Sequence, residues 1–173
     1  MLMDDQVEEI FPPLPLEEWE ETRNTLHRFA QIVGKIRLRS APFQNHWWHV
    51  PLYVSATGLR TGPMPYENTS FEIEFDFIDH YLIVTSSTGE AQDFPLEDDL
   101  TVADFYRQTF ECLEELGIYV QIDPRPFDLA IAEPFETDTI HAFYDAEYVS
   151  CYWRILTQID GIFKTGSESA PRR

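Results

Sequence analysis

Residues 71–77, Phe-Glu-Ile-Glu-Phe-Asp-Phe, alternate without exception between apolar and acidic side chains. Successive side chains of a β-strand point to opposite faces, so this segment predicts a strand with one buried face and one acidic face. A sheet built around such a strand needs a cover for its apolar side. Segments with helical periodicity lie before and after it, and the predicted fold class is therefore α+β.

Two turn signals after this strand extend it into a sheet. Asp79-His80 closes a tight turn into 81–86, and Thr88-Gly89 a second turn into 91–95. Residues 49–59 also have the character of a strand, with an early proline, and 118–122 predict another. The middle of the chain is thus predicted to be an antiparallel meander.

Three segments have apolar residues at helical spacing: 16–39, 101–116 and 145–164. We expect them to cover one face of the sheet. The inward face of the third would comprise Val149, Tyr152, Trp153, Leu156, Ile159 and Phe163. Gly34 leaves an alternative open for the first, a helix that ends there and is followed by a strand at 35–39. The predicted organisation is an extended proline-rich arm over 1–15, a single domain over 16–165 and a disordered tail over 166–173.

The overall composition excludes several classes of protein. The chain has 12 basic and 31 acidic residues, a net charge of −19, which would repel nucleic acids and anionic membranes. A hydrophobic content of 43% is that of a folded chain. Two cysteines do not make a disulfide framework. Without a secretory signal or an apolar run long enough to span a membrane, the expected location is the cytoplasm.

Charge is distributed unevenly along the sequence. Residues 1–22 carry eight acids and no base, whereas 23–60 carry six bases and no acid. This basic stretch either pairs with acidic neighbours inside the fold or forms a local site for a small anion held by arginine. Both interpretations remain open from the sequence.

The block Asn45-His46-Trp47-Trp48-His49 lies within the basic stretch. Indoles provide flat apolar walls with one N–H donor each, and imidazoles donate, accept or transfer a proton near neutral pH. Together they suit a small polar ligand with flat surfaces. The alternative is that both tryptophans are core residues and both histidines bond to backbone carbonyls.

Signals for other chemistry are weak. The histidine spacing does not predict a metal site, and no cofactor motif occurs, so no metal or cofactor is expected. Cys112 and Cys151 are predicted to fill the core. The carboxylates Glu72, Glu74 and Asp76 are expected on the solvated face of their strand; the alternative is that they pair with Arg28, Lys35 and Arg39 or receive a ligand cation.

Several short blocks together resemble one family. They are Leu14-Pro-Leu-x-x-Trp19, Thr25-Leu-His27, Gln31-Ile-Val-Gly-Lys35, Asn45-His-Trp-Trp-His-Val-Pro-Leu-Tyr53, Phe71-Glu-Ile-x-Phe-Asp-Phe77, Val102-Ala-Asp-Phe-Tyr106 and His141-Ala-x-Tyr144-Asp145. The chain is similar over about 11–164 to an uncharacterised bacterial family known only as a domain of unknown function. The resemblance supplies no reaction, but it directs attention to the block and to His27, Lys35 and His141.

The resemblance also implies a further aromatic and glycine-rich segment beyond the third helix, which this chain does not have. The resemblance therefore implies a shortened or truncated relative, in which a site completed by the additional segment would be incomplete. A face left bare by that loss would need covering, and a homodimer is the simplest way to cover it.

The leading functional hypothesis is a domain, or a degenerate or truncated enzyme, that binds a small anionic or polar ligand. The predicted site residues are Asn45, His46, Trp47, Trp48 and His49, the cationic Lys35, Arg37 and Arg39, and the further histidines His27 and His141. The alternative is a structural or interaction domain without a small-molecule site. Acid–base catalysis would require a carboxylate within hydrogen-bond reach of one of the histidines, in a cleft.

Overall fold

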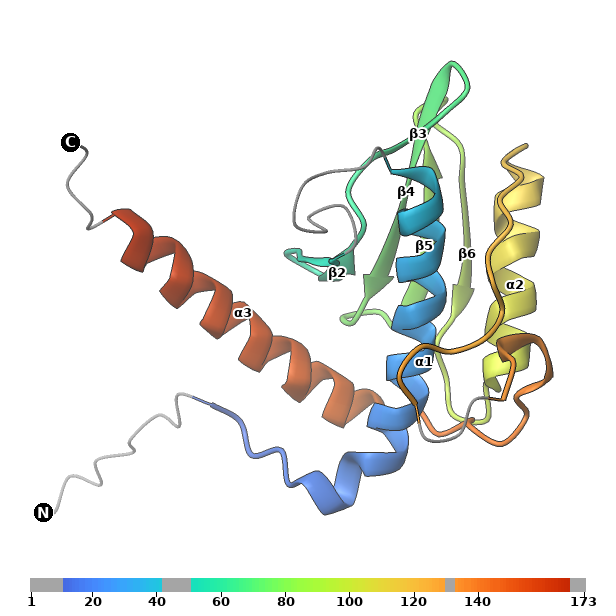
Figure 1. Cartoon of the computed structure of the whole chain (residues 1–173). Helices are drawn as coiled ribbons and strands as arrows, with labels where there is room; N and C mark the ends of the chain where they lie inside the picture. The colour runs from blue at the N-terminus through green and yellow to red at the C-terminus, as the bar shows by residue number, and fades with distance from the viewer. Residues whose placement is uncertain (1–10, 42–50, 130–132, 169–173) are drawn as a thin grey trace, which may run out of the picture.

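The computed structural model describes residues 11–41, 51–129 and 133–168. In this part of the chain a six-stranded antiparallel sheet packs against helices, so the predicted α+β fold is confirmed (Figure 1). The strands are β1 (Tyr53–Val54), β2 (Gly58–Arg60), β3 (Met64–Tyr66), β4 (Thr69–Asp76), β5 (Tyr81–Ser86) and β6 (Ala91–Pro95). The helices are α1 (Leu16–Ser40), α2 (Val102–Glu115), α3 (Ala146–Glu168) and the short 3₁₀ turn η2 (Phe135–Thr137). The sheet order is β1-β2-β4-β5-β6, and β3 pairs with the start of β4.

Strand β4 has the two faces that its alternation predicts. Phe71, Ile73 and Phe75 are buried in the core. On the other face, the acids contact nearby residues. Glu72 lies 3.8 Å from Arg60, and Glu74 accepts a hydrogen bond from Ser55 at 2.7 Å. Asp76 accepts a hydrogen bond from a backbone N–H of the following turn. These partners differ from the Arg28, Lys35 and Arg39 of the alternative interpretation.

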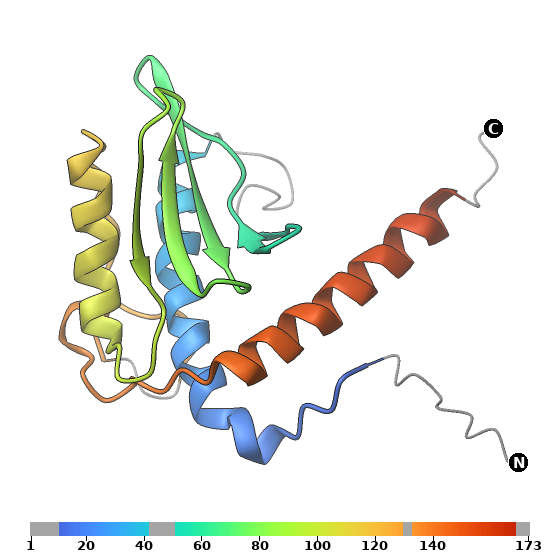
Figure 2. The same ribbon diagram turned by 180° about the vertical axis from the view of Figure 1, so that it is seen from behind.

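Helix α1 is continuous through Gly34, so the alternative strand at 35–39 is wrong. The helix lies between the sheet on one side and the connection from α2 to α3 on the other (Figure 1, Figure 2). Its side chains are therefore buried on several faces, and Phe29 stacks on Phe105 of α2 with ring centroids 3.9 Å apart. Tertiary burial on both sides outweighs the local cost of one helical glycine.

Residues 49–59 do not form the single strand predicted for them. The described part, from Pro51, makes the short hairpin β1–β2. The Ser55 hydroxyl accepts hydrogen bonds from the backbone N–H groups of Thr57 and Gly58, which turns the chain between the two strands. At Gly58 a β-carbon would lie 1.9 Å from the carbonyl oxygen of Phe75, so the hairpin approaches β4 as closely as only glycine permits.

Residues 118–122 follow α2 and are not a strand, contrary to prediction. Helix α2 begins at a Thr101 cap and ends before Gly117, which has a φ of +72°. No described strand pairs with the segment that follows. Ile118 is nonetheless buried, and Val120 and Ile122 pack on the core. The alternation here reflects a segment lying on the core rather than a place in the sheet.

Helix α3 departs from the prediction that all three helices cover the sheet. Asp145 caps it as predicted, through the N–H groups of Glu147 and Tyr148. Val149 is fully buried, but the helix then leaves the body of the molecule (Figure 1, Figure 2). Ile162 and Phe163 are 60% and 73% exposed. The distal half of α3 therefore does not cover the sheet.

The described chain begins before α1 and ends with α3. Residues 11–15 precede α1 without helix, as the prolines predict. At the other end α3 continues to Glu168, three residues into the segment predicted as a tail. None of the helices in the described ranges has the length and hydropathy needed to cross a membrane.

Candidate functional site

Five predicted site residues, Asn45 to His49, lie outside the residues that the structure describes. The hypothesis that their side chains line a recess stays a prediction. The remaining five, His27, Lys35, Arg37, Arg39 and His141, are all described, and they occupy four different surroundings.

Arg37 is engaged within the fold. Its side chain is buried, and its two terminal nitrogens donate to the carbonyl oxygen of Pro51 and to the Tyr53 hydroxyl. The guanidinium also lies 4.5 Å from the centroid of the Tyr53 ring, a cation–π distance. These contacts fasten the chain entering β1 to the C-terminal part of α1.

His141 belongs to a buried charged cluster with Asp138 and Arg28. Its Nδ1 lies 2.8 Å from Asp138 Oδ2, and the same oxygen lies 3.2 Å from Arg28 Nε. Asp138 is fully buried and also accepts from the backbone N–H groups of Ile140 and His141. Burial lowers the pKa of Arg28, and the Asp138 carboxylate opposes that shift.

The cluster meets one of the two conditions for acid–base catalysis. Nδ1 of His141 is the ring nitrogen that contacts the carboxylate of Asp138, which leaves Nε2 as the nitrogen free of that contact. The side chain is 15% exposed. None of the five main cavities in the described chain includes His141, however, so the required cleft is not among them.

His27 and Lys35 line a groove along α1, which we call the His27 groove. It consists of two cavities, of about 320 and 470 Å³, that share His27 and Ala30. The first lies between α1, the sheet and α3, and the second beside Leu52 and Phe127. Apart from His27 and Ala30, the lining residues are Trp19, Arg23, Leu26, Leu59, Phe75, Phe77 and Tyr152 in the first and Gln31, Gly34, Lys35, Leu38, Leu52 and Phe127 in the second.

Among the described residues, no carboxylate lines either cavity of the His27 groove, although the chain carries 31 acidic residues. The three other main cavities all contain acids, for example Glu114, Asp104 and Asp98 respectively. The titratable groups of the groove that carry or gain positive charge are Arg23, His27 and Lys35. The groove is therefore a basic, mainly apolar recess on a strongly acidic protein.

His27 stands where the two cavities meet. Desolvation by burial, with smaller contributions from Arg28 and Arg23, lowers its pKa, which favours the neutral form of the ring. Its Nε2 lies 3.3 Å from the side-chain nitrogen of Gln31. Gln31 in turn makes two hydrogen bonds to the backbone of Phe127, which hold the α2–α3 connection against the groove.

The two full cations lie at opposite ends of the groove. Lys35 Nζ is 6.0 Å from the centroid of the Phe135 ring. Arg23 is partly exposed, with Nη2 3.4 Å from Glu20 and also near the Asn24 carboxamide. An anionic group entering the groove would meet a cation at either end and an apolar wall between them.

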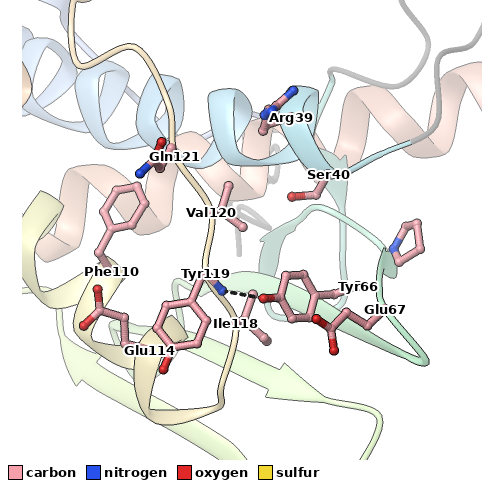
Figure 3. Close-up of a pocket in the computed structure, with 11 residues that line it drawn as sticks. Arg39, Ser40, Tyr66, Glu67, Phe110, Glu114, Ile118, Tyr119, Val120 and Gln121 are labelled. Atoms are coloured by element: carbon pink, nitrogen blue, oxygen red, sulfur yellow. Dashed lines mark hydrogen bonds between the residues drawn. The ribbon is translucent and has the colours of Figure 1, made fainter.

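Arg39 lies elsewhere, at the rim of a separate cavity at the C-terminal ends of α1 and α2 (Figure 3). The structure thus brings together His27 and Lys35 of the predicted site but separates them from Arg37, Arg39 and His141. Within the basic stretch, Arg28 and Arg60 pair with acids of the fold, whereas Lys35 lines a recess. The local anion site stays a prediction.

Sequence reasoning missed the walls of the His27 groove. Trp19 and Tyr152 have ring centroids 5.3 Å apart, and Phe127 closes the far cavity. The two helical residues were expected only as core positions, because periodicity identifies an apolar face but not its neighbour. Phe127 and Asp138 come from a proline-punctuated connection that has no periodic signal.

The described residues do not indicate a metal site or a reactive cysteine. There, no three His, Cys, Asp or Glu side chains gather closely enough to hold a metal ion. Cys112 is buried in α2, as predicted, and burial raises its pKa to about 11, which disfavours the reactive thiolate. Cys151 is half-buried on α3.

Comparison with known proteins identifies a family. The family model DUF5996, described as a family of unknown function, matches residues 11–168. The chain belongs to this family. The match covers α1, the sheet, α2 and α3, including the His27 groove. No curated protein and no solved structure matches the chain.

Proposed function

We propose that this DUF5996 protein binds a small amphipathic anion, an apolar body with a carboxylate or sulfonate group, in the His27 groove. The observation that carries the proposal is the lining of the groove, to which the described residues contribute three basic side chains and no acid in a protein of net charge −19. Coulomb repulsion from the acidic surface would otherwise disfavour any anion.

The walls of the groove define the rest of the ligand. Trp19, Phe75, Phe77 and Tyr152 supply most of the apolar lining of one cavity, and Leu38, Leu52 and Phe127 supply most of it in the other. Binding sites for small molecules have volumes of roughly 300–1,000 Å³ and combine apolar walls with a few polar groups. A flat or branched apolar body fits between the two cationic ends. Asn45 to His49 stay in the proposal as predicted additional contacts.

A pair of fluorescent probes tests this proposal. 1-Anilinonaphthalene-8-sulfonate has the required apolar rings and anionic head, and N-phenyl-1-naphthylamine has the same rings without the charge. We expect saturable binding of the sulfonate at the groove, with the neutral probe bound roughly three- to tenfold more weakly. Titration followed by fluorescence measures both dissociation constants. Equal affinity for the two probes would overturn the assigned charge preference.

Three variants test the location of the sulfonate site. Lys35→Gln is expected to weaken its binding roughly threefold to tenfold and to leave the neutral probe unaffected. Ala30→Leu fills the junction of the two cavities and is expected to weaken the binding of both probes. Lys164→Gln is the matched control, because it removes the same charge from the distal part of α3, where Lys164 pairs with Asp160. An equal loss in Lys164→Gln and Lys35→Gln would contradict the assignment.

The pH dependence provides a second readout in the same titration. A bound anion favours protonated His27, whose pKa is lowered in the free protein. Sulfonate affinity is therefore expected to rise as pH falls below the ordinary value of 6.5, whereas the affinity for the neutral probe stays constant. His27→Gln is expected to abolish that rise.

A specific observation favours the alternative function, an interaction domain. The distal part of α3 exposes Ile159, Ile162 and Phe163 on a helix that projects from the body (Figure 1). These residues repeat at three- and four-residue steps, so they form one apolar face. The partner proposed for it is a second copy of this chain, through an isologous helix pair.

A further inference from the structure

A second site lies in the cavity that includes Arg39, which we call the Arg39 cavity. It has a volume of about 540 Å³ and lies where α1, α2 and the β3–β4 hairpin meet (Figure 3). Residues 118–121, which follow α2, form one of its walls. It contains none of the residues of the His27 groove, so a function assigned to it is independent of the groove.

Opposite charges face the Arg39 cavity from different elements. Arg39 and Ser40 come from the last turn of α1, whereas Glu67 comes from the β3–β4 turn and Glu114 from α2 (Figure 3). Among the described residues, neither carboxylate pairs with Arg39 or with another base. The cavity thus presents one cation and two anions that have no ion-pair partner within the described ranges, which favours a ligand with charges of both signs.

The wall at 118–121 offers backbone groups to an extended ligand. Ile118 is buried and Val120 packs on the core, so this segment is held in place. The N–H of Tyr119 donates to the Tyr66 hydroxyl at 3.1 Å (Figure 3). The backbone N–H and C=O groups of Val120 and Gln121, by contrast, have no hydrogen bond to any described residue. Exposed extended backbone of this kind pairs with an added peptide strand.

Aromatic rings complete the recess between the charges. Tyr66, Phe110 and Tyr119 line it, and Tyr119 is 68% exposed. Their faces suit the alkyl part of a basic side chain and attract its charged end.

We propose that the Arg39 cavity binds a short extended peptide that has a basic side chain and a free C-terminal carboxylate. The carboxylate contacts Arg39 and Ser40, the basic group lies between Glu67 and Glu114, and the peptide backbone pairs with Val120 and Gln121. The cavity volume accommodates about two or three residues.

Three synthetic peptides test the proposal on the full chain by isothermal titration calorimetry. They are Ala-Ala-Arg with a free carboxylate, the same peptide as its C-terminal amide, and Ala-Ala-Gln with a free carboxylate. We expect the first to bind with the highest affinity and each of the others about tenfold more weakly, because each loses one charge-assisted contact. Equal affinities for the three peptides, or no saturable binding of the first, would overturn the proposal.

Matched variants assign each charge to its partner. Arg39→Gln is expected to weaken the binding of Ala-Ala-Arg with a free carboxylate about tenfold and to leave the affinity for the C-terminal amide unchanged. Glu114→Gln is expected to weaken the binding of Ala-Ala-Arg and to leave the affinity for Ala-Ala-Gln unchanged. Glu115→Gln is the control, since this neighbouring acid on α2 is not part of the cavity.

These side chains are exposed, so the variants are expected to fold, which circular dichroism checks. If Glu115→Gln and Glu114→Gln weakened the binding of Ala-Ala-Arg equally, the affinity would come from overall charge and the assigned contacts would be wrong. The peptide is not expected to displace the naphthalene sulfonate from the His27 groove, so failure of either proposal is distinguishable from failure of the other.

Discussion

Arg28 is a charge that the fold encloses almost completely. Its side chain is 5% exposed, and its Nε faces the fully buried Asp138 while a terminal nitrogen donates to the carbonyl oxygen of Asn24. The pair joins α1 to the connection before α3. A buried ion pair contributes little net stability compared with apolar residues, but each partner is costly to leave alone.

Replacement of Arg28 by Met is therefore expected to destabilise the protein strongly. Asp138 would keep its backbone donors and His141 but lose its cation, and breaking a buried pair costs roughly 3–5 kcal/mol. Urea unfolding measures the change. Arg107→Met is the control, because Arg107 pairs with Asp104 and Glu111 at the exposed surface, where solvent screens an ion pair and it contributes little to stability. Comparable losses in the two variants would show that Arg28 is not held as described.

The β1–β2 hairpin is the element on which sequence and structure differ most clearly. Its two strands are short, and its turn depends on the Ser55 hydroxyl, while Gly58 lets it approach β4. The hairpin also receives a hydrogen bond from α3, where Trp153 Nε1 donates to the Ser55 carbonyl oxygen at 3.4 Å. The hairpin therefore links the sheet to α3, as does Ser150 of α3, which donates to the carbonyl oxygen of Phe77.

Two glycine substitutions are expected to have opposite effects. In Gly58→Ala the new β-carbon would collide with the Phe75 carbonyl, so we expect a loss of roughly 2 kcal/mol or more. In Gly161→Ala nothing lies within 4 Å of the new β-carbon, and the helical alanine is expected to stabilise α3 by about 0.5–1 kcal/mol. Thermal unfolding measures both. A neutral Gly58→Ala would contradict the close approach of the hairpin to β4.

Local patterns predicted the elements whose partners lie nearby in sequence. The alternation of Phe71 to Phe77 and the two turn signals after it predicted β4, β5 and β6, because hairpin strands pair with their neighbours in the chain. The same reasoning failed at 118–122. Alternation there places Ile118 and Val120 on the core, and only the absence of a neighbouring described strand distinguishes this segment from β4.

The whole molecule consists of a packed body and the projecting helix α3. Contact with the body is concentrated in the first turns, where Val149 is buried and Tyr152 packs against Trp19. Segment 11–15 extends from the body on the same side as α3 (Figure 1, Figure 2). An apolar helix face on that side remains accessible to another molecule.

Self-association through α3 is expected to depend on concentration. Burial of an aromatic or branched side chain contributes roughly 1.5–3 kcal/mol, so Ile162→Glu with Phe163→Glu is expected to shift a dimer to monomer. Sedimentation velocity over a range of concentrations measures this. Thr157→Glu is the control, because Thr157 lies on the side of the same helix opposite to the apolar face. This variant should leave the dimer intact. A wild-type protein that stays monomeric throughout would rule out this partner.

The sequence by itself determined the α+β class, the positions of the three helices and the central strands, because helical and strand periodicities are local properties of the chain. It also pointed to His27 and Lys35. Only the tertiary structure decided that these two share an acid-free groove, that Arg28 is buried against Asp138 and that Arg39 faces a different cavity. Which side chains surround a given charge depends on contacts between segments that are distant in sequence, and no local pattern encodes those contacts.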